Sequence, residues 1–125
     1  IRKADRFRGP VLLRDLHPAV LIGYAWRLQI EAEAPVFTQA AAYAGQVRLR
    51  PSDAAVLATL TSADGGILRI SDTVLELALR ADQTADLMPR RIVLDLVRTD
   101  LVPGLHLGFL LEIPVILPVT RGLAP

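Results

Sequence analysis

The chain of 125 residues contains no cysteine, which excludes a disulfide scaffold and any thiolate metal site. Aromatic residues are also scarce, at 5% of the chain. No apolar run reaches the ~20 residues of a membrane-spanning helix, because Glu112, Pro114 and Pro118 interrupt the longest candidate. The formal net charge is only +1, so we expect neither a nucleic-acid partner nor a membrane partner.

What the chain has in abundance is apolar side chains, which make up 52% of the residues. The mean hydropathy of +0.40 excludes the disorder typical of weakly hydrophobic chains. A chain of this length is the size of one domain and can bury a core without metals or disulfides. We therefore predict a single folded domain.

Apolar and polar residues alternate along most of the sequence, as they do in strands with one buried face. Leu75, Leu77 and Leu79 are expected to point inward, with Glu76 and Arg80 outward. The alternation predicts strands at 24–32, 46–50, 54–62, 67–71, 73–80, 91–99 and 107–113. The spacing of the strands and turns is typical of an all-β sandwich or barrel of about seven to eight strands.

The turns between these strands carry their own signals. Asp64, Gly65 and Gly66 predict a hairpin, because Asp-Gly and Gly-Gly tolerate positive φ. Residues 81–87 predict at most one short helical turn, with Asp82 as a possible cap. Pro114 removes a ladder hydrogen bond, so residues 115–120 are expected to form an edge strand or a bulged continuation.

No group of residues suggests catalysis. The two histidines, His17 and His106, have no acidic ligand motif beside them, and no Gly-rich phosphate loop is present. Asp95 is the acid expected to be partly buried, in a salt bridge or a hydrogen bond to a turn amide. We therefore predict no catalytic, cofactor-binding or metal-binding residue, no cofactor, and a protein that is not an enzyme.

Positive charge is concentrated at the N-terminus, where residues 1–14 hold five basic residues against Asp5. A basic arm on a mildly acidic body suggests docking onto a partner. We divide the chain into residues 1–33, an N-terminal arm with the first strand or strands, and residues 34–125, the body. The alternative is that the arm is itself a strand of the sandwich. The candidate partner-interface residues are Arg2, Lys3, Arg6, Phe7, Arg8, Val11, Leu12 and Leu13.

The order of motifs from Pro35 to Arg121 resembles a module of phage and prophage tail proteins, the baseplate upper-protein N-terminal-domain-like family. The correspondence begins with an apolar strand at 35–38 and an Arg-containing strand at 44–48. It continues with the strand at 56–62, the Asp-Gly turn at 64–67, the Leu-rich strand at 75–79 and the Thr-containing helical turn at 81–85. It ends with Val-Leu-Asp-Leu at 93–96 and Val-Thr-Arg at 119–121.

This resemblance implies an Ig-like antiparallel β-sandwich that acts as an assembly module of a virion. The protein would be a structural component of a tail, baseplate or fibre attachment, made in the bacterial cytoplasm and present in several copies beside other virion proteins. The alternative function is a carbohydrate- or surface-binding module, for which Tyr24, Trp26 and Tyr43 are the candidate aromatic platforms.

Overall fold

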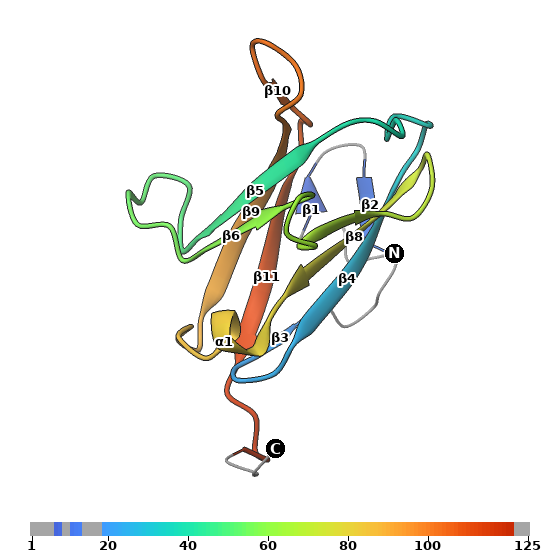
Figure 1. Cartoon of the computed structure of the whole chain (residues 1–125). Coiled ribbons are helices and arrows are strands. Elements are labelled where there is room, and N and C mark those ends of the chain that lie inside the picture. The colour runs from blue at the N-terminus through green and yellow to red at the C-terminus, as the bar shows by residue number, and fades with distance from the viewer. Residues whose placement is uncertain (1–6, 9–10, 14–18, 122–125) are drawn as a thin grey trace.

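The computed structural model describes residues 7–8, 11–13 and 19–121, which form two β-sheets around one hydrophobic core (Figure 1). The first sheet contains β1 (Phe7–Arg8), β3 (Val20–Leu21), β5 (Tyr43–Arg48), β6 (Ala58–Thr61), β9 (Arg91–Arg98), β10 (Leu105–His106) and β11 (Leu110–Ile116). The second contains β2 (Val11–Leu13), β4 (Trp26–Ala32), β7 (Ile67–Arg69) and β8 (Val74–Leu79). The one helix of the described residues is α1 (Ala81–Thr84), so the predicted all-β fold class with one short helical turn is confirmed.

The strand order is β1-β11-β9-β5-β6 in the first sheet and β2-β4-β8-β7 in the second. All pairings are antiparallel except that of β3 with the end of β11. The described residues form eleven strands, more than the seven or eight expected, because β1, β3 and β10 are too short to show a periodic pattern. The Ig-like assignment stays a prediction.

The core lies between the two sheets and follows the predicted alternation. In β8 the side chains of Leu75, Leu77 and Leu79 are buried, whereas Glu76 is partly exposed and Arg80 is exposed. In β4 the same alternation buries Trp26, Leu28, Ile30 and Ala32. The opposing sheet contributes Leu94, Leu96, Leu111 and Ile113. Burial of these apolar side chains is the main force that holds the sheets together.

The turn at Asp64, Gly65 and Gly66 differs from the hairpin we expected. Gly65 has the positive φ of 87° that the turn signal predicted. However, β6 before the turn pairs with β5, and β7 after it pairs with β8. The turn therefore carries the chain from one sheet to the other. The strand before it also starts later than predicted, at Ala58, and Val56 is exposed.

Pro114 lies within β11, an inner strand, so the expectation that this proline ends central pairing was wrong. Val115 donates its N–H to the carbonyl of Arg90 on the β9 side. Because N–H directions alternate along a strand, the nitrogen of Pro114 faces the other flank. Among the described strands, β1 pairs only with residues 110–111 on that flank and β3 only with 115–116. The missing donor therefore falls between two short partner strands.

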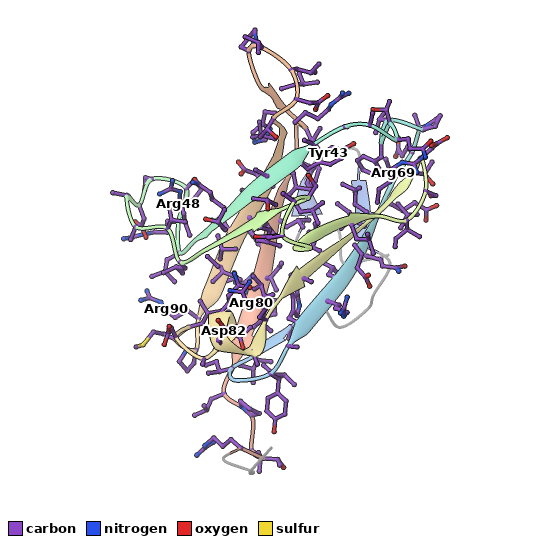
Figure 2. The ribbon with its side chains drawn as sticks, in the orientation of Figure 1. Tyr43, Arg48, Arg69, Arg80, Asp82 and Arg90 are labelled. Atoms are coloured by element: carbon purple, nitrogen blue, oxygen red, sulfur yellow. The ribbon has the colours of Figure 1, made fainter. Side chains whose placement is uncertain are left out.

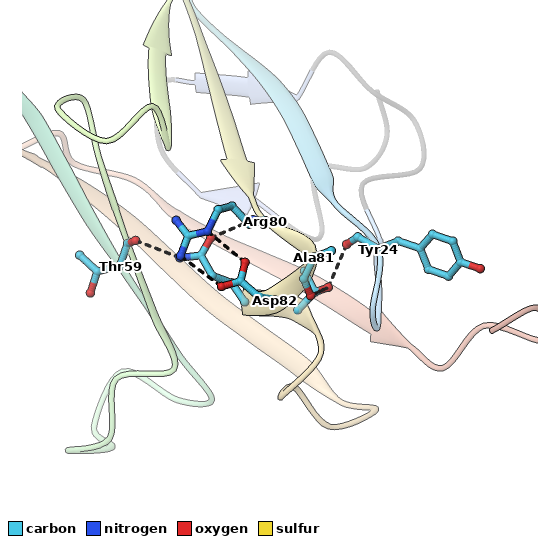
Figure 3. A network of polar contacts seen from close by, with 7 residues as sticks. Tyr24, Thr59, Arg80, Ala81 and Asp82 are labelled. Atoms are coloured by element: carbon cyan, nitrogen blue, oxygen red, sulfur yellow. Dashed lines mark hydrogen bonds and ion pairs between the residues drawn. The ribbon is translucent and has the colours of Figure 1, made fainter. Parts of the chain in front are cut away.

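The helical turn α1 begins after Arg80, not after Asp82 as predicted. The backbone N–H of Arg80 is bonded to Oε1 of Gln83 at 2.8 Å. Asp82 lies in the first turn, where its carboxylate accepts hydrogen bonds from the Arg80 guanidinium (Figure 3). This pairing lowers the pKa of Asp82. A carboxylate in the first turn also interacts favourably with the helix dipole.

Candidate partner interface

Among the described residues, no group of three or more histidine, aspartate or glutamate side chains could hold a metal ion. His17 lies outside the described residues. In the part of the chain that the structure describes, no helix is long and apolar enough to span a membrane.

His106 is held in place from both sides of its ring. Nε2 lies 2.8 Å from Oδ2 of Asp95, and the backbone N–H of Gly108 donates to Nδ1 at 2.8 Å. Since Nδ1 accepts a hydrogen bond, the neutral ring carries its proton on Nε2 and donates it to Asp95. Asp95 is thus partly buried and hydrogen-bonded, as expected, but its partner is the ring of His106 and not a turn amide. The contact fixes β10 against β9 and the turn that leads into β11.

The predicted N-terminal interface falls into two parts. Arg2, Lys3 and Arg6 lie outside the described residues. Phe7–Arg8 form β1 beside β11, and Val11–Leu13 form β2 beside β4. For these five residues the structure favours the strand alternative over a free arm. Their contact with a partner stays a prediction.

Most of the partner-binding aromatic residues considered above are in the core. Trp26 is 5% exposed and Tyr43 is 3% exposed, so neither can serve as a flat platform for a sugar. Tyr24 is 39% exposed, and its hydroxyl donates to the carbonyl of Thr120 at 2.5 Å. The alternative of a carbohydrate-binding surface therefore retains one of its three aromatic candidates.

Arginine side chains of the body mainly support loops (Figure 2). Arg48 donates to the carbonyls of Asp53 and Ala54 and so braces the β5–β6 loop. Arg69 donates to the carbonyl of Phe37 at 2.8 Å and pairs with Asp72. Each of these two guanidinium groups has at least two partners within the chain, so we do not assign them to a partner surface.

The hydroxyl of Tyr43 is a polar group within the hydrophobic core. Its ring packs edge-on against Phe37, with centroids 6.2 Å apart, but its buried hydroxyl has no hydrogen-bond partner among the described residues. Burial raises the pKa of this hydroxyl. A buried unsatisfied hydroxyl is unfavourable, so Tyr43→Phe is expected to leave the free energy of unfolding unchanged or raise it by up to ~1 kcal/mol. Urea denaturation measures this, and a loss of more than ~1 kcal/mol would show that the hydroxyl has a stabilising partner.

An apolar cavity of about 330 Å³ opens at the end of the molecule where β4 stops and β10 lies. Its lining includes Val36, Phe37, Leu105 and Phe109, together with the exposed carboxylate of Glu33. Cavities that are mostly apolar with a few polar groups are the usual form of binding sites. The lining of this cavity is mostly apolar, with few polar groups, so it is a candidate binding site.

The charged residues around this cavity are mostly paired. The Arg98 guanidinium makes two hydrogen bonds to the carboxylate of Asp100, at 3.1 and 2.6 Å. This pairing lowers the pKa of Asp100 to about 2, and the backbone N–H of Ala42 donates to the same carboxylate. The pair anchors the start of the β9–β10 loop to β5.

Beyond that anchor the β9–β10 loop protrudes from the body of the molecule (Figure 1). Val102 at its tip is 99% exposed, and Leu105 at its base is 51% exposed. The sequence did not lead us to expect a binding surface at this loop. The available signal was the absence of any polar side chain from 101 to 105, which is unusual for a solvent-facing loop.

The chain matches no family model, no curated protein and no solved structure. The candidate interface therefore depends on geometry alone.

Proposed function

We propose that this chain is a structural protein of a tailed phage, a prophage or a phage-derived particle. In that setting it is an assembly module of the tail, the baseplate or a fibre attachment, with an Ig-like arrangement of its two sheets. Its partners are other virion proteins, and it is made in the bacterial cytoplasm and incorporated in several copies.

The observation that carries this proposal is apolar surface exposed at both ends of the molecule. Val102 and Val119 are 99% and 96% exposed, whereas other valines of the domain, such as Val47, are buried in the core. Exposed apolar clusters on a folded domain mark contacts with other proteins. The resemblance of residues 35–121 to the tail-protein family supports the same function, because modules of that family act by assembling.

The proposal is tested on intact particles from the bacterium that encodes the chain. An antibody raised against the purified chain should label one position on tailed particles after prophage induction, as seen by immunogold electron microscopy. Particles from a strain that lacks the gene are the control. If intact particles are released but the chain stays entirely in the soluble fraction, the proposal is wrong.

A further inference from the structure

The apolar cavity and the exposed segment 117–121 lie at opposite ends of β11. Phe109, which lines the cavity, immediately precedes this strand, and Leu117 immediately follows it. Seven strand residues at ~3.3 Å each separate the two features by about 23 Å. Figure 1 shows β10 at one end of the molecule and the C-terminal segment leaving the other. One chain thus carries a hollow at one end and a projection at the other.

The projecting segment makes one hydrogen bond with the body and one within itself. The hydroxyl of Tyr24 donates to the carbonyl of Thr120, and Nη1 of Arg121 donates to the carbonyl of Pro118 at 2.7 Å. Val119, between these two bonds, is 96% exposed. A segment that is already ordered loses less conformational entropy on binding than a free one. Val119 is therefore presented to solvent by a preorganised segment.

The cavity has room for this segment. An apolar cavity of about 150 Å³ is large enough to bind benzene. The cavity described above measures about 330 Å³, so it can hold the side chain of Val119 and part of its neighbour Leu117. Burial of these side chains would remove exposed apolar surface at both ends of the molecule.

Charge at the cavity complements charge on the segment. Among the described residues Glu33 forms no ion pair, whereas the other charged lining groups, Arg98 and His106, are engaged with Asp100 and Asp95. In the segment, Arg121 binds a backbone carbonyl and pairs with no acid of the described chain. The chain bends at Val119 and Thr120. Arg121 lies two residues after Val119, at most ~7 Å along the chain, so its long side chain can reach the rim of a cavity that Val119 enters.

We propose that copies of this chain associate head to tail, with Val119 of one copy in the apolar cavity of the next and Arg121 paired with Glu33. The two contacting surfaces differ, so the interface is heterologous and builds rings or filaments instead of a closed two-fold dimer. A contact based on one inserted segment is smaller than the ~800 Å² per partner of stable complexes. Association of the isolated chain is therefore expected to be weak and to increase with concentration.

The first test measures the mass of the purified full chain by sedimentation equilibrium over a range of concentrations. The wild-type mass should rise above that of the monomer. Val119→Asp should weaken association by about 30-fold or more, as the loss of a central apolar anchor does. Val56→Asp is the matched control, because this exposed valine lies on the β5–β6 loop away from both ends. A wild-type chain that is monomeric at every concentration, or equal effects of the two variants, would overturn the proposal.

The second test asks whether the interface is heterologous. Ala34→Trp fills the cavity and leaves the segment intact, whereas Val119→Asp does the reverse. Each variant alone should be monomeric, and an equimolar mixture should form a 1:1 dimer that grows no further. Glu33→Arg and Arg121→Glu should each weaken association of the otherwise wild-type chain, and the double variant should restore it. Absence of both the mixed dimer and the rescue would contradict the assigned contact.

This inference supplies the contact between copies that the proposed multi-copy assembly requires, and to that extent it rests on the proposed function. The two can fail separately, because sedimentation uses the isolated chain and immunogold labelling uses particles. Labelled particles with a monomeric chain would refute only the contact. An associating chain that is absent from particles would refute only the virion function.

Discussion

Leu77→Ala is expected to lower the free energy of unfolding by roughly 2–5 kcal/mol, the range for large-to-small changes in a well-packed core. Leu77 is fully buried in β8 and lies opposite Leu28 on one neighbouring strand and Ile67 on the other. Removal of its side chain would leave a cavity between the neighbouring residues of β4 and β7. Urea denaturation followed by circular dichroism measures the loss.

The control for this prediction is the adjacent residue on the other face. Glu76 points away from the core and lies 3.5 Å from Nη1 of the well-exposed Arg27. The Glu76 side chain is 18% exposed and the Arg27 side chain 69% exposed, so solvent screens the pair only on the arginine side. Exposed ion pairs contribute ~1 kcal/mol or less, and Glu76→Ala should therefore cost about 1 kcal/mol, clearly less than Leu77→Ala. Equal losses for the two variants would mean that the assigned faces of β8 are wrong.

The faces of β4 and β8 could be predicted from the sequence because only one side of each strand is buried. Under that condition, a shift of one residue would expose every leucine, so the pattern determines the orientation. β9 differs, because apolar residues occupy both of its faces, and the neighbours Val93 and Leu94 are both buried.

The partner of each strand could not be predicted in the same way. A turn sequence such as Asp64-Gly65-Gly66 determines local backbone angles, but it does not determine whether the next strand stays in the same sheet. Leu60 before the turn and Ile67 after it are both buried in the common core. Both side chains can be buried whether the chain crosses to the other sheet or forms a hairpin. The local pattern is therefore compatible with either arrangement.

The candidate interface was missed for a related reason. An apolar run such as residues 101–105 resembles a buried segment when only hydropathy is considered. The cavity is assembled from residues 32–37, at and just after the end of β4, and from residues of 98–109 around β10, which are far from them in the sequence. Such a site becomes visible only when the sheets are placed in space.

The sequence predicted the helical turn that contains Thr84, but it did not show what the threonine hydroxyl does there. Thr84 stands out among the buried side chains of the described residues as polar and fully buried. Its Oγ1 donates to the carbonyl of Tyr24 at 2.8 Å and accepts the N–H of Gly23 at 3.1 Å. The hydroxyl thus ties α1 to the turn before β4. Gly23 has a φ of +87°, a conformation that glycine adopts without strain.

Thr84→Val is expected to lower the free energy of unfolding by roughly 2–3 kcal/mol, because it preserves shape but leaves the Gly23 N–H and the Tyr24 carbonyl without their partner. Thr84→Ser is the control, since it keeps the hydroxyl and removes one methyl group, at a cost of about 1 kcal/mol. Urea denaturation of the two variants separates the hydrogen bonds from the packing. A valine variant as stable as the serine variant would mean that the hydroxyl does not hold this turn. Because Tyr24 also bonds Thr120, the valine variant should in addition weaken the head-to-tail association, which sedimentation at a temperature where the variant remains folded would detect.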